Sequence, residues 1–317
     1  MNNSIQVDQL SKHYGDFVAV NQIAFSIHPG EVVGFLGPNG AGKSTTLKML
    51  TGYLAPTQGS AHIQGINVLE SPIAAQQQIG YLPENAPLYP DMTVHEYLTY
   101  IAKIRGLGRA ERTGAIKRVS AQCSISERWH QPIGELSKGF RQRVGLAQAL
   151  IHDPPIVILD EPTTGLDPNQ IIEMRKLIRE IGRTKTVILS THILSEVQLT
   201  CDRVIIIDQG SLVADGTVEE IIEQSQSHLN WKLVLCADSI DLPLKHIQSK
   251  LQDIDGIDSV THLPNATEGE TVFTLGCTMD IRKSVFNVVV QQGLVLLEMS
   301  PNRDDLESVF HKLTERG

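Results

Sequence analysis

The sequence predicts an α/β protein in which a mainly parallel sheet flanked by helices is followed by a smaller α+β unit. From residue 1 to about residue 223, short β-branched runs alternate with longer helical stretches, which is the pattern of strand–helix–strand units. After the polar segment 225–227, a new strand-like run begins at Trp231. We therefore expect two domains, comprising residues 1–223 and 224–317.

Composition indicates a folded protein and excludes some functions. The chain has 317 residues, of which 41% are hydrophobic and 20% charged, too ordinary a composition for a disordered protein. A net charge of -9 argues against nucleic acid as a partner. Residues 1–10 do not resemble a secretory signal, and no apolar run approaches the ~18 residues that cross a bilayer. We expect a protein inside the cell that reaches a membrane only through a partner.

Three strands of the first domain can be placed directly. They are predicted at 31–36, 156–159 and 186–189, each a short apolar run that ends in polar residues. Ligands of open α/β sheets gather at the carboxyl ends of strands. The three strand ends are therefore expected to converge on one site.

The second domain shows a regular order of elements. The predicted elements are a strand at 231–236, a helix at 244–251, strands at 257–263 and 271–275, a helix at 280–292, a strand at 294–299 and a final helix from Asp304. This βαββαβ order is that of a ferredoxin-like unit with one extra helix.

A phosphate-binding loop follows the first predicted strand. Residues 37–44 read Gly-Pro-Asn-Gly-Ala-Gly-Lys-Ser, which fits the P-loop pattern in full, and a helix opens at Ser44. Lys43 would neutralise the β- and γ-phosphates, and Ser44 would offer its hydroxyl to Mg²⁺. A glycine turn with a surface lysine is disfavoured by the strand and helix around it. The expected ATP-binding residues are Gly37, Pro38, Asn39, Gly40, Ala41, Gly42, Lys43, Ser44 and Thr45.

An acidic pair ends the strand predicted at 156–159. Asp160 would hold Mg²⁺, and Glu161 would polarise the water that attacks the γ-phosphate. A strand ending in solvated acidic residues is the alternative interpretation. The P-loop upstream favours the catalytic one.

A third motif distinguishes among P-loop proteins. Residues 136–143 read Leu-Ser-Lys-Gly-Phe-Arg-Gln-Arg, which resembles the Leu-Ser-Gly-Gly-Gln signature of ABC transporter nucleotide-binding subunits. The segment would start a helix, whose N-terminus can bind phosphate. The resemblance implies an ABC ATPase domain with antiparallel strands and a helical subdomain, and it implies that Ser137, Lys138 and Gly139 face the ATP of a second subunit. Lys138 and Phe140 depart from the commonest form of the signature.

The resemblance covers roughly the first 220 residues and assigns further roles. Tyr14, placed before the first full strand, matches the aromatic residue that stacks on adenine. Asp167, in Gly165-Leu166-Asp167, matches the D-loop that crosses the dimer interface. His192 matches the switch histidine that contacts the γ-phosphate and the attacking water.

Glu84 stands where the family usually has a glutamine that reaches Mg²⁺. A carboxylate keeps the acceptor oxygens, but it adds negative charge and cannot donate. The sequence Leu-Pro-Glu at 82–84 and the segment 305–310 resemble the branch that serves drug exporters and gliding-motility complexes.

The predicted function is therefore that of an ATP-hydrolysing subunit in which two copies enclose two ATP molecules and drive a separate transmembrane permease, for export. The subunit would be cytoplasmic, at the inner face of the membrane, with the permease docking on residues 84–96. A soluble ABC ATPase acting on a macromolecular complex and a small-molecule kinase are the alternatives. The second domain either braces the dimer, which we favour, or senses a ligand.

Overall fold

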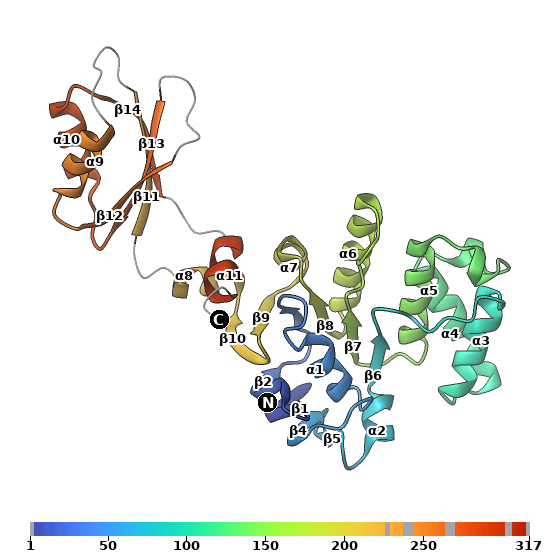
Figure 1. Cartoon of the computed structure of the whole chain (residues 1–317). Coiled ribbons are helices and arrows are strands. Elements are labelled where there is room, and N and C mark those ends of the chain that lie inside the picture. Colours follow the sequence, from blue (N-terminus) through green and yellow to red (C-terminus); the bar gives the residue numbers. More distant parts are fainter. Residues whose placement is uncertain (1–2, 226–228, 237–243, 264–269, 302–305, 315–317) are drawn as a thin grey trace. The chain divides into compact units, whose positions relative to one another are not determined.

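The computed structural model describes residues 3–225, 229–236, 244–263, 270–301 and 306–314 (Figure 1). Contacts divide the chain into two compact units, residues 1–218 with 313–317, and residues 219–312. The predicted boundary after residue 223 lies slightly later, within α8 (Val218–Ser225).

The larger unit contains an antiparallel sheet of four strands. Its order is β2 (Phe17–Ile27), β1 (Ile5–Tyr14), β4 (Gln58–Ile63) and β5 (Ile66–Asn67). Register shifts interrupt the pairing of β1 with β2. Such irregularities break the alternation of buried and exposed side chains that reveals a strand in a sequence.

The six-stranded sheet carries the predicted site. Its order is β10 (Ser211–Gly216), β9 (Arg203–Asp208), β3 (Val32–Leu36), β8 (Thr186–Thr191), β7 (Ile156–Asp160) and β6 (Ile79–Leu82), parallel except at the β10 edge. The three predicted strands are β3, β7 and β8, which lie side by side. This confirms that their carboxyl ends meet at one edge.

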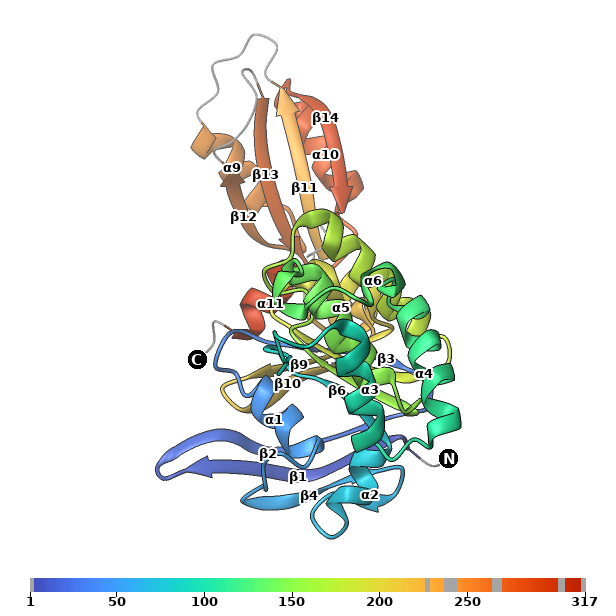
Figure 2. The same ribbon diagram turned by 90° about the vertical axis from the view of Figure 1, so that its right-hand side faces the viewer.

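Both faces of this sheet are covered, so its central strands are apolar at nearly every position. In β7, Val157 and Leu159 belong to a core shared with the helices, whereas Ile156 and Ile158 belong to a core shared with the antiparallel sheet. Figure 2 shows α1 (Lys43–Leu50) between the two sheets.

The other helices of the larger unit lie around the six-stranded sheet or form a helical region at one end of the unit, seen in Figure 1 as α3, α4 and α5. They are α2 (Pro72–Gln77), α3 (Val94–Ile104), α4 (Arg109–Gln122), α5 (Lys138–Leu150), α6 (Pro168–Gly182) and α7 (Leu194–Thr200), with 3-10 turns at Ser126–Arg128 and Ile133–Glu135. Thr93 and Glu96 form a reciprocal capping box that starts α3. Trp129 packs on His95 in this region, with ring centroids 5.5 Å apart.

The smaller unit has the predicted βαββαβ order. Its elements are β11 (Leu229–Cys236), α9 (Leu244–Gln252), β12 (Ile257–Leu263), β13 (Glu270–Cys277), α10 (Arg282–Gln291) and β14 (Val295–Pro301), followed by α11 (Leu306–Thr314). The antiparallel sheet has the order β12-β13-β11-β14 and packs through Leu233, Phe273 and Leu275 on α9 and α10. Its Trp231 ring lies 5.6 Å from the Arg282 guanidinium. The predicted start of the last helix, Asp304, lies outside the described residues.

None of the helices in the described ranges has the length and apolar character needed to traverse a bilayer.

Candidate functional site

The P-loop connects β3 to α1 and wraps around the Lys43 side chain. Gly40 and Gly42 have φ angles of 83° and 105°, a backbone conformation that only glycine adopts without strain. A Cβ at position 42 would lie 2.6 Å from the Ala19 carbonyl oxygen, so nothing larger than glycine fits there. Lys43 Nζ donates hydrogen bonds to the carbonyl oxygens of Gly37 at 2.7 Å and Pro38 at 3.1 Å. The ammonium group is thereby held inside the loop.

The acidic pair is fixed by a serine that the sequence did not single out. Ser190, at the end of β8, donates from Oγ to Asp160 Oδ1 at 2.6 Å, and its Oγ accepts from the Glu161 N–H at 3.0 Å. Glu161 has a φ of 49°, in the left-handed region that is uncommon for a residue with a side chain. One buried hydroxyl therefore ties both acidic residues to the neighbouring strand. Its only sequence signal is its place at a strand end.

The P-loop and the acidic pair are in direct contact. Ser44 Oγ donates to Asp160 Oδ1 at 3.1 Å, and Lys43 Nζ lies 3.6 Å from Glu161 Oε1. Burial lowers the pKa of Lys43, and the negative charges of Glu161, Asp160 and Glu84 partly oppose that shift. The site therefore holds a desolvated cation beside three acidic residues.

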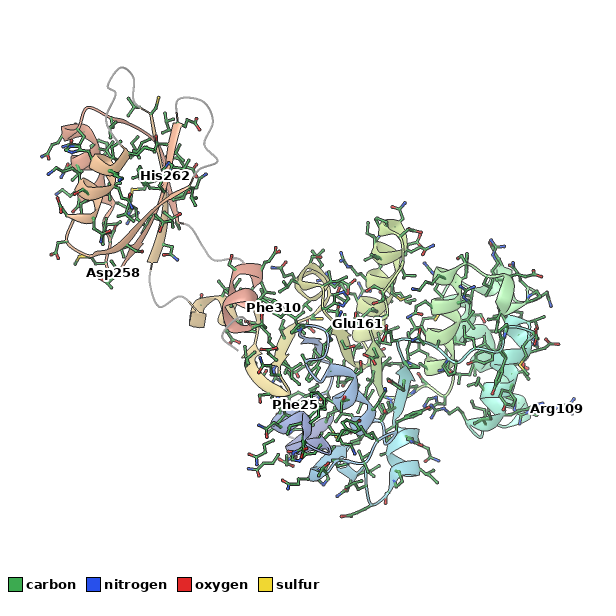
Figure 3. All side chains as sticks on the ribbon, viewed as in Figure 1. Phe25, Arg109, Glu161, Asp258, His262 and Phe310 are labelled. Atoms are coloured by element: carbon green, nitrogen blue, oxygen red, sulfur yellow. The ribbon has the colours of Figure 1, made fainter. Side chains whose placement is uncertain are left out.

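Glu161 has two further partners at the mouth of the site. His192 Nδ1 lies 2.9 Å from Glu161 Oε2 and 3.1 Å from Oε1, and Thr164 Oγ1 donates to Oε2 at 3.1 Å. Figure 3 labels Glu161, which follows β7. Its carboxylate thus contacts an imidazole, a hydroxyl and an ammonium group. Thr164 is a second site residue that sequence reasoning missed.

These groups surround a cavity of about 460 Å³. Its lining brings together most of the predicted nucleotide-site residues, including Tyr14, Glu84, Glu161 and His192. The lining residues are Tyr14, Phe17, Ala19, Asn39, Gly40, Gly42, Lys43, Ser44, Thr45, Glu84, Glu161, Thr164 and His192. Gly37, Pro38, Ala41 and Asp160 are not among the lining residues, but Gly37 and Pro38 accept hydrogen bonds from Lys43, and Asp160 accepts one from Ser44.

The placement of Tyr14 before the first full strand was wrong. Tyr14 ends β1 and pairs with Phe17 at the start of β2. The register shifts of β1 hid that strand in the sequence. Tyr14 is 51% exposed and Phe17 is 64% exposed, and both line the cavity. The structure therefore supplies a second aromatic candidate for stacking on a base, which sequence reasoning missed.

The signature and D-loop residues lie together but not in this cavity. Ser137 caps α5 by accepting a hydrogen bond from the Phe140 N–H at 3.4 Å. A Cβ at Gly139 would lie 2.6 Å from the Gln170 side chain of α6, and Asp167 caps α6 by accepting from the Gln170 N–H at 2.9 Å. The residues that line the P-loop cavity do not include Ser137, Lys138, Gly139 or Asp167.

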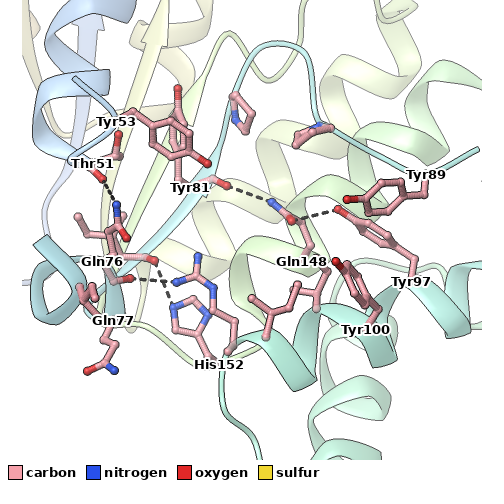
Figure 4. Close-up of a pocket in the computed structure, with 17 residues that line it drawn as sticks. Thr51, Tyr53, Gln76, Gln77, Tyr81, Tyr89, Tyr97, Tyr100, Gln148 and His152 are labelled. Atoms are coloured by element: carbon pink, nitrogen blue, oxygen red, sulfur yellow. Dashed lines mark hydrogen bonds between the residues drawn. The ribbon is translucent and has the colours of Figure 1, made fainter.

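A second, larger cavity opens between the sheets and the helical region (Figure 4). This aromatic groove has a volume of about 670 Å³, and five tyrosines line it, at positions 53, 81, 89, 97 and 100. Gln148 joins its two sides, because its Oε1 accepts from the Tyr97 hydroxyl at 3.1 Å and its Nε2 donates to the Tyr81 carbonyl at 3.3 Å. His152 lies at 3.2 Å from the Ile79 carbonyl, and burial lowers its pKa to about 4. Part of the predicted docking segment, including Pro87 and Tyr89, lines this groove.

Comparison with known proteins gives one consistent result. The family model described as ABC transporter matches residues 20–164. The bacitracin transport ATP-binding protein BcrA of Bacillus licheniformis is 32% identical over 322 residues, covering 100% of this chain and 99% of BcrA. The Nod factor export ATP-binding protein I of Burkholderia orbicola is 37% identical over 220 residues, covering 69% of this chain and 72% of that protein. A solved ATP-binding subunit of an ABC transporter superposes with a TM-score of 0.64 at 32% identity, over 69% of this chain and 92% of the other.

Proposed function

The chain belongs to the family of ABC transporter ATP-binding subunits, and from this premise we propose that it hydrolyses ATP between two subunits to drive export through a separate transmembrane permease. The observation that carries the proposal is the placement of Glu161, which contacts His192, Thr164 and Lys43 beside the P-loop. A carboxylate so placed can act as a general base.

The P-loop would bind the triphosphate through its backbone N–H groups and Lys43. In the structure, the ammonium group donates hydrogen bonds to the carbonyl oxygens of Gly37 and Pro38. Phosphate oxygens would be better partners, because charge-assisted hydrogen bonds are the stronger kind. Tyr14 or Phe17 would stack on the adenine.

The donor set around Ser44 suits Mg²⁺. Ser44 and Asp160 present a hydroxyl and a carboxylate 3.1 Å apart, and Glu84 lines the same cavity. Magnesium prefers hard oxygen ligands and is usually held by one or two carboxylates together with substrate phosphates. The bound ion would neutralise negative charge on the phosphates as the bond to the γ-phosphate breaks.

In the proposed reaction, a water molecule held by Glu161 attacks the γ-phosphorus, the carboxylate takes a proton from that water, and the bond to the bridging oxygen breaks, so that ADP and phosphate are formed. His192 would fix the direction of the carboxylate through its Nδ1 contact and approach the transferred phosphate. This assigns the catalytic roles to Glu161, His192 and Lys43.

A second subunit would complete each site. Ser137, Lys138, Gly139 and Asp167 lie at the starts of α5 and α6 and do not line the cavity of their own chain. We assign them to the ATP bound by the partner copy, where the α5 N-terminus can meet phosphate oxygens. Loss of the γ-phosphate would then release the interface.

The aromatic groove is the proposed docking site of the permease. Its tyrosines and prolines offer a wide surface for one helix of a partner, which is how apolar grooves commonly bind amphipathic helices. This docking would hold the subunit on the cytoplasmic face of the membrane. We propose export because the relative from Burkholderia is described as an export ATP-binding protein. The smaller unit would brace the dimer.

The test compares ATP hydrolysis and dimer formation in the wild-type protein and Glu161→Gln, with ATP and Mg²⁺. We expect the variant to lose at least about a hundredfold in turnover, the usual scale for a general base, and to accumulate as an ATP-bound dimer. The neighbouring Thr163→Ser is the control that keeps both properties. A Glu161→Gln variant that turns over normally would contradict the assignment of the base.

A further inference from the structure

Glu196 is a buried carboxylate that none of these roles uses. It lies in α7 and is 1% exposed. Its Oε2 accepts a hydrogen bond from Thr191 Oγ1 at 2.8 Å, whereas its Oε1 is buried with no hydrogen-bond partner among the described residues. Burying a carboxylate so poorly satisfied opposes folding, and an apolar residue at such a place is often more stable. A glutamate at this position is therefore expected to lower the stability of the fold, which points to a functional reason for its presence.

Thr191, the hydrogen-bond partner of Glu196, also binds the backbone on the other side of His192. Thr191 Oγ1 donates its only hydrogen to Glu196, and the same oxygen accepts from the Ile193 N–H at 3.0 Å. Because a carboxyl oxygen of Glu196 accepts this hydrogen bond, the direction of the hydroxyl is fixed and a lone pair of its oxygen is left for the N–H. The residues before and after His192 are thus tied to one oriented hydroxyl.

His192 lies between Thr191 and Ile193 and contacts the proposed general base, Glu161. Its Nδ1 lies 2.9 Å from Glu161 Oε2. The imidazole is 41% exposed, so its surroundings cover it only in part. The position of the ring therefore depends on the backbone that carries it, and small displacements of reacting groups cost large factors in rate.

We propose that Glu196 is a positioning residue for ATP hydrolysis, which acts by orienting the Thr191 hydroxyl and thereby holding the backbone of His192 against Glu161. This inference rests on the proposed ATP hydrolysis. It assigns to α7 a part in the reaction although none of its side chains lines the cavity.

The experiment measures kcat and KM for ATP, together with thermal unfolding, in the full chain carrying Glu196→Leu or Thr191→Val. Both variants break the hydrogen bond between Thr191 and Glu196, and Thr191→Val also removes the acceptor of the Ile193 N–H. We expect kcat to fall about tenfold to a hundredfold, the scale of misplacing a catalytic group, with KM for ATP changed less than about twofold. The double variant should be no slower than either single one, because the two residues act as a unit.

Two conservative variants separate positioning from a purely structural role. Thr191→Ser keeps the hydroxyl and Glu196→Gln keeps an acceptor oxygen, so both should retain turnover within about threefold of wild type. Glu196→Leu should unfold at a temperature no lower than wild type, because it removes a buried carboxyl group with one oxygen that lacks a hydrogen-bond partner among the described residues. A slower protein that is no less stable is a result that a structural role would not produce.

Wild-type turnover in Glu196→Leu or Thr191→Val would overturn the inference, as would a loss in Thr191→Ser equal to that in Thr191→Val. A wild-type protein that binds ATP without hydrolysing it would instead overturn the proposed function, and this inference with it.

Discussion

The nucleotide cavity and the aromatic groove belong to the same unit, but they differ in the chemistry of the side chains that form them. At the cavity, the Lys43 ammonium group lies 3.6 Å from the Glu161 carboxylate, and the hydroxyls of Ser44 and Ser190 donate to Asp160 at 3.1 Å and 2.6 Å. The groove is lined by phenol rings, and its histidine, His152, has a pKa lowered to about 4, so it is neutral near pH 7. One region is organised to bind charge and the other to fit a shape.

The two regions are nevertheless connected by short stretches of chain. Lys43, at the start of α1, lines the cavity, and Thr51, just after the end of that helix, lines the groove. Pro83 lines the groove and the next residue, Glu84, lines the cavity. Movement of a partner in the groove would therefore reach the phosphates through one helix and one peptide bond.

The largest effect is expected from Lys43→Ala, which removes the only lysine in the lining of the cavity. Turnover should fall at least about a hundredfold, because the variant loses a preorganised charge at the transferring phosphate. Lys48→Ala, on the exposed side of α1, is the matched control and should behave as wild type. ATP hydrolysis and the binding of a fluorescent ATP analogue measure both. Normal turnover in Lys43→Ala would show that the cavity does not act through charge.

Ser190→Ala should have the next largest effect. The substitution removes the hydrogen bonds that join Asp160 and Glu161 to β8, and it leaves Asp160 with one donor fewer. We expect at least about a tenfold loss of kcat, since a hydrogen bond to a charged group, as that to Asp160, contributes about 1.5–3 kcal/mol. Ser195→Ala, an exposed serine of α7, serves as control. Equal rates for the two variants would mean that Ser190 does not orient the acidic pair.

In the groove, Tyr89→Ala with Tyr100→Ala should weaken docking of the permease and leave chemistry intact. Both rings are exposed and line the groove, and tyrosines of this kind often dominate binding. We expect at least about a tenfold loss of affinity for membrane vesicles that contain the permease, with ATP hydrolysis by the isolated subunit unchanged. Leu69→Ala, at an exposed residue outside the groove lining, is the control. Loss of isolated turnover would instead show that the two regions are not separable.

The smallest effect concerns pH. His152 has a folded-state pKa of about 4 against an ordinary value of 6.5, because burial disfavours its charged form. Between these values the unfolded chain binds more protons than the folded one, so stability falls as pH drops through this window. His152→Gln should show a shallower decline in melting temperature from pH 6.5 to 4.5 than wild type. Identical slopes would mean that His152 is protonated in the fold.

Several features of the fold and the site could be predicted from the sequence. The P-loop and the acidic pair were predicted because each chemical role needs particular residue types at the ends of parallel strands, whereas the role of His192 was predicted from the resemblance to the ABC family. The order of elements in the smaller unit was predicted because each strand and helix has its own regular period. The family assignment followed from the signature at 136–143.

Other features depend on contacts between distant parts of the chain. Ser190 looks like any strand-end serine until β8 is placed beside β7. Tyr14 was misplaced because the register shifts of β1 interrupt its alternation. The groove draws its tyrosines from segments between residues 51 and 152, and no local pattern connects them.

The distribution of tryptophan gives the molecule a convenient optical property. The chain contains two, and each unit holds one: Trp129 beside His95 in the larger unit, and Trp231 beneath Arg282 in the smaller one. Replacing Trp129 by Phe would leave an emission signal from the smaller unit alone, and replacing Trp231 would do the reverse. Fluorescence-monitored denaturation of the two single-tryptophan proteins would then reveal whether the units melt in one cooperative step or in sequence.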